Sequence, residues 1–389
     1  MAKVGDVFLL IRNGASIKQT EGASGLPITR IETISSRVVD RNKMGYADVV
    51  DNGEYDDYIL QDGDILMSHI NSEKHLGKTA IYENLDSEKI IHGMNLLVLR
   101  CDERLIPKYA YYFFNSNRFI HQIPNITKKS VNQASFNVSA LKQLYIPVPD
   151  KEVQKDIISV LDKVDNLCDC YNKQLNDLEL LIKSRFIELF GDPVSNPKNW
   201  AKKAIKEFAT DVRYGTSKPA IEGGRYPYLR MNNLTYDGRL DLSDLKYIDI
   251  PDNELEKCVV KYGDILFNRT NSIELVGKTC LFEFNYPMVI AGYIIRIRLN
   301  DRVTPLYLTT YMNLEFMKKQ LRNMAKGAVN QANINAQEMQ SIIVPVPPLD
   351  LQNQFADFVE EVNKSKLEVQ KSLEELETLK KSLMQQYFG

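Results

Sequence analysis

The most regular hydrophobic pattern in the chain begins near residue 157. Apolar side chains recur there at alternating spacings of four and three residues, at Ile157, Leu161, Val164, Cys168, Tyr171, Leu175, Leu178 and Ile182. This spacing is the heptad seam of a coiled-coil helix. The pattern returns near the end of the chain at Phe355, Val359, Val362, Lys366, Val369, Leu373 and Leu376. We therefore predict two long helices, over residues 151–192 and 349–389, each a rod of roughly 60 Å.

A different pattern precedes each predicted helix. Short apolar runs rich in β-forming residues, such as YDDYILQDGDILMSHI at 55–70 and YPMVIAGYIIRIRL at 286–299, alternate with Gly, Asn and Asp clusters. Such runs indicate strands joined by turns. A more helical segment follows them at 107–123 and again at 305–321. The sequence thus predicts an α+β domain over residues 1–150 and a second over residues 193–348.

These two halves of the chain are copies of each other. GDILMSHINSEKHLGKTAIY at 63–82 returns as GDILFNRTNSIELVGKTCLF at 263–282, and VNQASFN at 131–137 returns as VNQANIN at 329–335. A period this long indicates a tandem duplication of a whole domain rather than a solenoid of small units. Because each helix needs a partner for its seam, we expect the two helices to pair as an antiparallel coiled-coil rod. The alternative is that each helix packs on its own domain.

The chemical inventory of the chain argues against an enzyme. The GKT at 77–79 lacks the glycine that a phosphate-binding loop needs five positions earlier, where Ser72 stands. None of the four histidines recurs at the matching position of the other copy, and the five cysteines lack the paired spacing of a zinc site. We find no dinucleotide loop, methyltransferase signature or paired-carboxylate nuclease motif. We predict a non-catalytic chain without a metal or cofactor of its own.

Composition places the chain among cytoplasmic proteins. Its 44% hydrophobic and 26% charged residues are typical of a soluble globular protein, and no apolar run is long enough to span a membrane. The net charge of −2 conceals an uneven distribution. Residues 193–348 contain 21 Lys and Arg against 16 Asp and Glu, a net charge of +5. A basic second domain favours contact with phosphates.

The segments retained in both copies contain the types of residue that contact DNA. Amide side chains can read base edges and lysines can hold phosphates. The first copy has Lys128, Lys129, Asn132 and Gln133, and the second has Lys326, Asn330 and Gln331. One departure is Gly327, which stands where the first copy has Lys129. The alternative for the amides is a capped loop that only positions the next helix.

The repeated GDIL stretch has a constant frame around a variable interior. Its Gly-Asp-Ile-Leu and Gly-Lys-Thr ends are the same in both copies, whereas SHINSEKHL between them becomes NRTNSIELV. Two similar frames with different side chains suit the reading of two different sequences. We expect DNA contacts from the residues His69, Asn71 and Lys78 in one copy, and Arg269, Asn271 and Lys278 in the other. Arg296 and Arg298 either contact phosphates or pair with acids of their own strand face.

The order of these motifs resembles one known family. IPVPDKEVQKDIISVLDKVDNLC at 146–168, KSRFIELFGDP at 183–193, VPVPPLDLQNQF at 344–355, the two GDIL stretches and the two VNQA segments are similar to the specificity subunits of type I restriction-modification systems. The resemblance implies that each α+β part is a target recognition domain for one half of a bipartite, asymmetric site in double-stranded DNA. It implies that the helices set the spacer between the half-sites.

The same resemblance implies the partners of the chain. Two modification subunits would dock on the helices and supply S-adenosylmethionine chemistry, and a restriction subunit with ATP and magnesium would join them. The alternative function is a duplicated coiled-coil scaffold that binds protein partners only. Sequence-dependent DNA binding would separate the two hypotheses.

Overall fold

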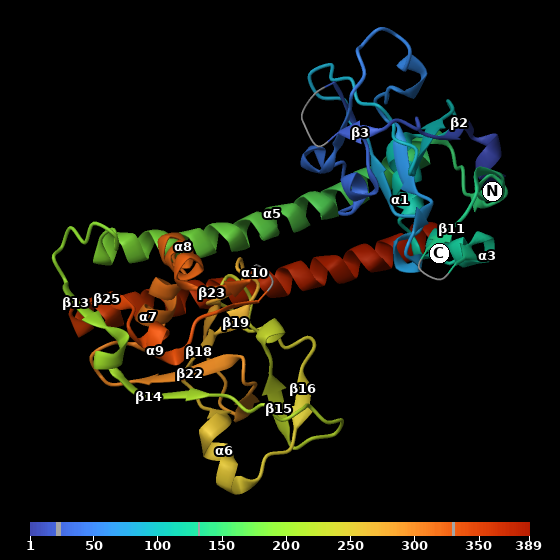
Figure 1. Cartoon of the computed structure of the whole chain (residues 1–389). Coiled ribbons are helices and arrows are strands. Elements are labelled where there is room, and N and C mark those ends of the chain that lie inside the picture. Colours follow the sequence, from blue (N-terminus) through green and yellow to red (C-terminus); the bar gives the residue numbers. More distant parts are fainter. Residues whose placement is uncertain (21–24, 131–132, 329–330) are drawn as a thin grey trace. The chain divides into compact units, whose positions relative to one another are not determined.

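The chain forms two compact units in a computed structural model that describes residues 1–20, 25–130, 133–328 and 331–389 (Figure 1). The first unit consists of Met1–Asn172 and Lys371–Gly389, and the second consists of Lys173–Gln370. Each unit therefore contains one copy of the repeat together with a part of both long helices.

The first unit is organised around a four-stranded antiparallel sheet in the order β2-β9-β6-β8. Two three-stranded sheets, β3-β5-β4 and β10-β11-β7, and the pair β1-β12 surround it. The strands are β1 (Ala2–Lys3), β2 (Phe8–Asn13), β3 (Gln19–Thr20), β4 (Leu26–Ile28), β5 (Gly45–Ala47), β6 (Ile65–Ser68), β7 (Ile70–Asn71), β8 (Thr79–Ile81), β9 (Leu96–Cys101), β10 (Lys128–Lys129), β11 (Ala134–Ser135) and β12 (Tyr145–Ile146). The short helices are α1 (Pro107–Phe114), α2 (Asn117–Ile120), α3 (Ile123–Ile126) and α4 (Val138–Leu141).

The second unit repeats this plan. Its central sheet has the order β14-β22-β18-β20, its small sheet β19-β24-β23, and its closing pair β13-β25. Its four-stranded sheet β16-β15-β21-β17 extends the pairing of β4 with β5 and the bridges of Ile91 in the first unit, and the second unit adds the helix α6. The strands are β13 (Ala201–Ala204), β14 (Ala209–Tyr214), β15 (Tyr226–Leu229), β16 (Lys246–Ile248), β17 (Val259–Val260), β18 (Ile265–Asn268), β19 (Thr270–Asn271), β20 (Thr279–Leu281), β21 (Met288–Ile290), β22 (Ile294–Leu299), β23 (Lys326–Ala328), β24 (Gln331–Asn333) and β25 (Ile343–Val346). The helices are α6 (Asp252–Cys258), α7 (Pro305–Met312), α8 (Glu315–Met324) and α9 (Ala336–Gln340).

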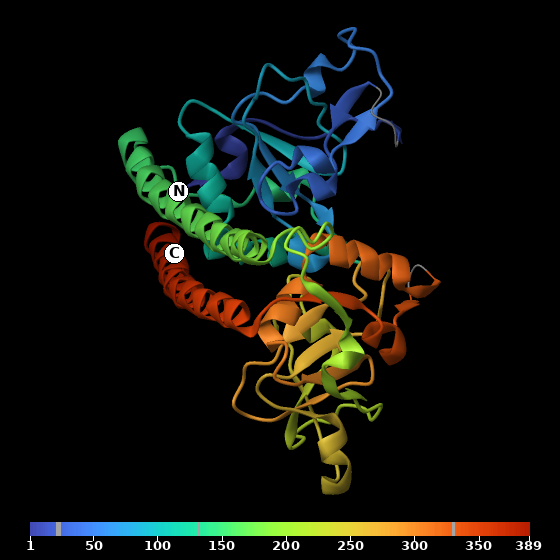
Figure 2. The same cartoon turned by 90° about the vertical axis from the view of Figure 1, so that its left-hand side faces the viewer.

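The local reasons for this fold also recur. Gly63 and Gly263 adopt φ of 83° and 87° in the turns that lead into β6 and β18, a conformation that costs glycine nothing. Both β2 and β14 carry a register shift near their first residues. Within the second unit, α6 lies at the end of the unit away from α10 (Figures 1 and 2).

The two long helices are α5 (Lys151–Phe190) and α10 (Leu349–Phe388), each of 40 residues. They run antiparallel within each unit. In the first unit Lys380 of α10 pairs with Asp165 of α5, and in the second Lys366 of α10 pairs with Glu179 of α5. The second contact lies on the predicted seam, where a polar residue fixes the register of a coiled coil. The α+β fold class with an antiparallel helix pair is confirmed.

Both helices also contribute to the core of each unit. In the first unit Phe388 packs on Tyr109 of α1, with ring centroids 5.4 Å apart. In the second, Phe186 of α5 stacks on Tyr307 of α7 at 5.3 Å and meets Phe355 of α10 at 5.4 Å. Helix pairing and packing on a domain, which the sequence left as alternatives, thus occur together.

The predicted seam residues lie on the packed side of the helices. Those with less than one tenth of their surface exposed are Ile157, Leu161, Val164, Ile182, Phe355, Val359, Val362, Val369 and Leu373, and the half-buried ones are Cys168, Tyr171, Leu175, Leu178, Lys366 and Leu376. The half-buried positions fall between the ends of each helix, and among them Leu178 still packs against the core of the second unit.

Candidate nucleic-acid interface

One small sheet in each unit brings the two retained segments of the sequence together. In the first unit β7, from the GDIL stretch, pairs with β11, from the VNQA segment, so that Asn71 lies opposite Ala134. In the second unit β19 pairs with β24, and Asn271 lies opposite Ala332. Segments about 60 residues apart in sequence therefore form one surface element in both copies. We call these three-stranded sheets β10-β11-β7 and β23-β24-β19 the tip sheets.

The predicted lysines lie on the outer strands of the tip sheets. Lys128 and Lys129 on β10 are exposed, and Lys129 forms an ion pair with Glu73 at 2.7 Å. Lys326 on β23 has 79% of its side chain exposed and pairs with Glu338, whose carboxyl pKa this contact lowers. Exposed ion pairs of this kind are weak, so the lysines can exchange their partners for phosphates.

The structure describes two of the four retained amide residues. Gln133 and Gln331 are exposed on the tip sheets. Asn132 and Asn330 lie outside the residues that the structure describes. Gly327 occurs in β23 with φ of 119°, where a Cβ would meet the carbonyl oxygen of Gln331. The absence of a lysine at this position thus has a conformational reason.

Asn71 and Asn271 bind their own loops through both ends of the amide. Their Oδ1 atoms accept the backbone N–H of Ser72 and Ser272, at 2.7 and 2.9 Å. Their Nδ2 atoms donate to the side chains of Ser68 and Asn268, at 3.4 and 2.8 Å. Their hydrogen bonds therefore hold the bend at the tip sheet in place. Each amide keeps one N–H donor and one lone pair outside these bonds, so a base contact could only use the direction that the loop bonds already fix.

Lys78 and Lys278 point toward the backbone of their own unit. The Nζ of Lys78 donates to the carbonyl of Ser35 at 3.1 Å, and the Nζ of Lys278 donates to that of Met231 at 2.8 Å. Lys278 is 8% exposed, and burial lowers the pKa of its ammonium. Lys278 thus supports the fold through its bond to Met231. This bond would have to break before the lysine could contact DNA.

His69 is the predicted site residue with the least access to a ligand. It is 4% exposed, its ring meets Phe136 with centroids 6.3 Å apart, and burial lowers its pKa to about 4. Arg269 occupies the matching place in the second unit but is half-buried, with its guanidinium 4.8 Å from the centroid of the Tyr214 ring. The structure therefore contradicts an exposed role for His69 and keeps one open for Arg269.

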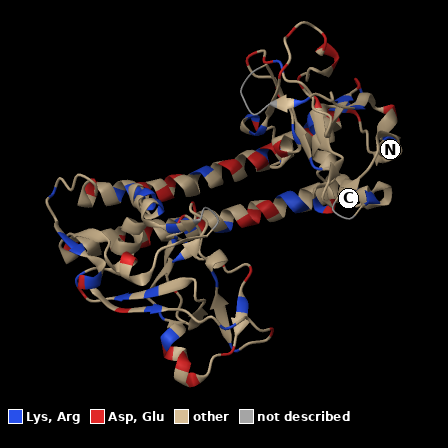
Figure 3. Ribbon diagram, viewed as in Figure 1, with Lys and Arg blue, Asp and Glu red and all other residues tan. Residues whose placement is uncertain are grey.

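The arginines of β22 pair with acids of neighbouring strands. Arg298 binds Asp264 of the turn before β18 at 2.8 Å, and Arg296, which has no exposed surface, binds Asp211 of β14. Arg100 makes the same bond as Arg298, to Asp64 in the first unit, also at 2.8 Å. Both basic and acidic segments occur in the second unit (Figure 3). Of the two alternatives for Arg296 and Arg298, ion pairing within the protein therefore holds. Their acidic partners lie on or next to neighbouring strands rather than on β22 itself.

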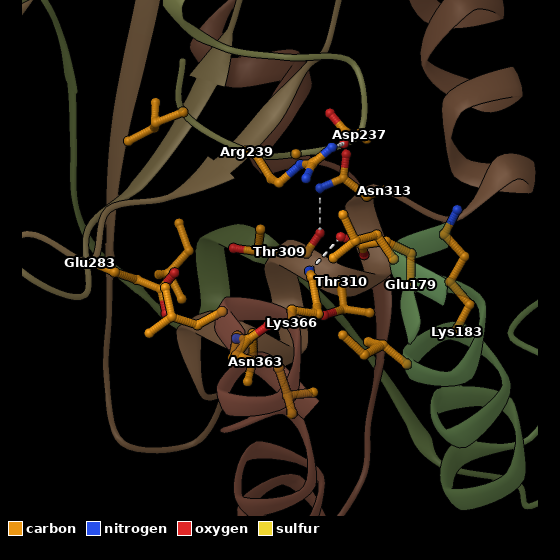
Figure 4. Close-up of a pocket in the computed structure, with 18 of the residues that line it drawn as sticks. Glu179, Lys183, Asp237, Arg239, Glu283, Thr309, Thr310, Asn313, Asn363 and Lys366 are labelled. Carbon is orange, nitrogen blue, oxygen red and sulfur yellow. Dashed lines mark hydrogen bonds and ion pairs between the residues drawn. The ribbon is translucent and has the colours of Figure 1, made fainter. Parts of the chain in front are cut away.

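A pocket of about 500 Å³ lies in the second unit between α7, the loop at 237–240 and the facing sides of α5 and α10 (Figure 4). Asn313 at its wall donates to the carbonyls of Thr279 and Thr309, at 2.7 and 2.9 Å. Burial raises the pKa of Glu283, and the nearby ammonium of Lys366 partly opposes that shift. The lining contains none of the residues predicted to contact DNA.

Two buried glutamines are functional positions that the sequence analysis missed. Gln154 in the first turn of α5 accepts the N–H of Ile106 at 2.9 Å and donates to the carbonyl of Arg104 at 2.8 Å. Gln352 in α10 makes the equivalent bonds to Thr304 and Arg302, at 2.8 and 3.1 Å. They fix the start of each long helix to its α+β part. Their recurrence at the repeat offset of 198 residues was the available signal.

The described part of the chain has neither a metal-binding cluster nor a membrane-spanning helix. Within residues 1–20, 25–130, 133–328 and 331–389, no group of three or more His, Cys, Asp and Glu residues is arranged to hold a metal ion. Over the same ranges, no helix is long and apolar enough to cross a membrane.

A duplicated α+β unit with paired long helices and a tip sheet on each unit is the architecture of a two-domain DNA specificity protein. A family model described as the type I restriction modification DNA specificity domain matches residues 1–180 and again residues 197–378. The chain therefore belongs to the family of type I restriction-modification specificity subunits, and its function is DNA sequence recognition within such a system.

Individual relatives agree with this assignment. The chain is 32% identical, over 97% of its own length and 90% of the relative, to a Methanocaldococcus jannaschii protein provisionally named the type I restriction enzyme MjaX specificity subunit. It is 22% identical to the EcoKI specificity subunit of Escherichia coli, over 93% of this chain and 81% of that one. The resemblance seen in the sequence is confirmed.

Solved structures show the same fold. A chain from a study of complex assembly and conformational transition in the type I restriction-modification system is 17% identical, with a TM-score of 0.58 over all of this chain and 96% of that one. The type I S subunit from M. genitalium is 15% identical, with a TM-score of 0.53 over all of this chain and 95% of that one.

Proposed function

We propose that each unit reads one half of a bipartite, asymmetric site in double-stranded DNA through its tip sheet. The observation that supports this proposal best is the repeated construction of the tip sheets. The same two retained segments build both of them in the same register, whereas the side chains at their bends differ, as at positions 69 and 269. A constant frame with different side chains suits the recognition of two different half-sites.

Within each tip sheet, the lysines and the bend would have separate tasks. Lys128, Lys129 and Lys326 are exposed on outer strands and would hold phosphates, which positions the unit without selecting a sequence. Residues at the bend, together with the exposed Gln133 and Gln331, would face base edges. The recognised sequence would then depend on these positions.

We further propose that α5 and α10 set the distance between the half-sites. Both helices continue through 40 residues, and Gln154 and Gln352 hold the first turn of each to its own α+β part. A helix pair fixed in this way is stiffer than a flexible linker, because each helix is bound at a defined register.

The remaining chemistry would reside on other subunits. Two modification subunits would dock on the helices and bring S-adenosylmethionine, and a restriction subunit would bring ATP and magnesium. This chain would need no cofactor of its own, and the assembly would work on DNA in the cytoplasm. A scaffold function limited to protein partners is the competing proposal.

Single-molecule methylome sequencing of cells that carry the chain and its modification subunits tests the proposal. We expect one bipartite motif with two unlike halves. In gel-shift assays of the complex, K128A/K129A should weaken binding to all sequences and reduce the salt dependence of log K by about 0.9 for each phosphate that these lysines neutralise. K89A removes an exposed, ion-paired lysine of the first unit outside the tip sheet and the long helices, and serves as the matched control. DNA binding without sequence preference, in the free chain and in the complex, would support the scaffold instead.

A further inference from the structure

The bend of the tip sheet holds one residue in the same backbone geometry in both units. The carbonyl of His69 accepts the N–H of Phe136 at 3.1 Å, and the carbonyl of Arg269 accepts that of Ile334 at 2.9 Å. The N–H of Arg269 also donates to the carbonyl of Tyr293 at 2.9 Å. The carbonyl bonds of the two residues correspond, but their side chains differ, because His69 packs inward on Phe136 and Arg269 lies over Tyr214.

The guanidinium of Arg269 is held in place without a carboxylate. Among the residues that the structure describes, no Asp or Glu forms an ion pair with it, and its Nε is buried without a hydrogen-bond partner. Most other arginines of the same unit have acidic partners, and Arg302 is the exception among the described residues. Those with acidic partners are Arg185, Arg213, Arg225, Arg230, Arg239, Arg296, Arg298 and Arg322. Arg269 is thus an oriented cation whose two terminal amino groups form no hydrogen bond to the residues that the structure describes, while its Nε is buried.

Tyr214 makes this orientation rigid. Its hydroxyl accepts the N–H of Ala336, at the start of α9, at 2.9 Å, which fixes the ring that supports the guanidinium. An arginine stacked on an aromatic ring loses less conformational freedom when it binds, because its plane is already set. The ring and the pinned backbone together fix the direction in which the fork of donors can point.

We propose that Arg269, supported by Tyr214, reads a guanine in the half-site of the second unit by donating to its O6 and N7 atoms. This inference rests on the proposed function. A planar fork of donors matches the two acceptors of a guanine edge in the major groove, and it is the side chain most often used for that base. The first unit cannot use this position in the same way, since His69 is buried.

A phosphate contact is the other use of an arginine fork, and the surroundings favour the base. The exposed and flexible Lys326 lies on the outer strand of the same tip sheet and suits a phosphate. Arg269 lies at the bend between β18 and β19, on the opposite edge of the tip sheet from β23, which carries Lys326. The direction of the Arg269 fork is set by Tyr214, and sequence selectivity requires such a fixed direction.

The test compares the base preference at each position of the methylation motif between the wild-type complex and complexes that carry R269K, Y214L or Y214F. R269K keeps the charge but loses the fork, so one guanine position of one half-site should relax tenfold or more. Y214L should relax the same position, because the guanidinium loses its platform. Y214F keeps the ring but loses the bond to Ala336 that fixes it, and should relax the same position less than Y214L does.

Each alternative result has a definite meaning. Uniform weakening over all sequences by R269K, with a lower salt dependence, would identify a phosphate contact and overturn the guanine assignment. An unchanged motif in R269K would also overturn it. A relaxed motif in R269K but not in Y214L would refute the supporting role of Tyr214 and leave the guanine contact of Arg269 standing. The other half-site and the melting transition monitored by Trp200 report whether each variant is folded. A wild-type motif without two halves would instead refute the proposed function.

Discussion

The two units build the same central sheet, but one pair of positions in it is charged in the second unit and apolar in the first. Asp211 and Arg296 form a buried ion pair between β14 and β22 of the second unit. By register, Leu10 and Val98 occupy these places in the first unit. An apolar pair and an ion pair thus serve the same fold, so the ion pair is not required by the sheet itself.

The difference relates to the segment above the sheet. Arg296 also donates to the carbonyls of Glu256 and Val259, at the end of α6 and in β17. The first unit has 3₁₀ turns at Arg41–Lys43 and Asp56–Tyr58 in the segment before β6 instead of such a helix. The buried arginine therefore anchors a feature particular to the second unit. Variation between the units lies at the bend and in these added segments, and the sheet stays constant.

The largest effect is expected from separating the ion pair. D211L leaves the fully buried Arg296 without its nearest carboxylate and should lower the free energy of unfolding of the second unit by about 3 kcal/mol. D211L/R296V, which installs the pair of the first unit, should recover at least half of that loss. Urea unfolding followed by the fluorescence of Trp200, the single tryptophan of the chain, measures both variants. A double variant less stable than D211L would show that the two pairs are not interchangeable.

Acid should weaken the first unit before the second. All four histidines lie in the first unit, and burial lowers the pKa of His69 and His92 to about 4. A folded-state pKa below the unfolded value near 6.5 means that the unfolded chain binds more protons between these values. Stability should therefore fall as pH drops from 6.5 toward 4, by on the order of 2 to 4 kcal/mol at pH 5 for both residues together.

Hydrogen exchange at pH 6.5 and 5 can follow each unit separately, through peptides from β9 and β22, after correction for the intrinsic exchange rate. H69Q/H92Q is the matched variant, which should be less stable at pH 6.5 and nearly independent of pH over this range. Equal losses in both units of the wild type would contradict the assignment to the buried histidines.

The two bracing lysines should differ in importance. K278M removes a buried bond to the carbonyl of Met231 and should cost about 1 kcal/mol, since the loss of this bond is partly offset by removing a costly buried charge. K78M removes the more exposed bond to Ser35 and should cost about half as much or less. Thermal unfolding of the two variants measures the difference. A larger loss of stability in K78M than in K278M would contradict the expectation that the more buried bond matters more.

The smallest effect is expected in the helix pair. K366L replaces a seam lysine with 17% of its side chain exposed, and should change stability by less than about 1 kcal/mol, toward greater stability. K380L changes the corresponding contact to Asp165, where the side chain is 38% exposed, and should have almost no effect. Urea unfolding compares the two. Marked destabilisation by K366L would contradict this expectation and show that the bond to Glu179 contributes net stability to the helix pair.

The sequence predicted those features that depend on neighbours along the chain. Heptad spacing indicated both long helices, and the repeat of GDIL and VNQA indicated two equivalent domains. It could not predict the packing of His69, because Phe136 is 67 residues away in the chain, or the bond from Lys278 to Met231. Arg269 appeared as a candidate only as a basic residue; its support by Tyr214 depends on tertiary contacts. Such contacts decide which candidate side chains remain available to DNA.

The central claim is that each unit reads its own half of the DNA site, and exchange of one unit tests it most directly. Residues 1–150 would be replaced by the corresponding segment of another member of the family, and the methylome of cells carrying the hybrid and its modification subunits would be sequenced. We predict a motif in which one half changes while the other half remains. A motif altered in both halves, or in neither, would contradict the account.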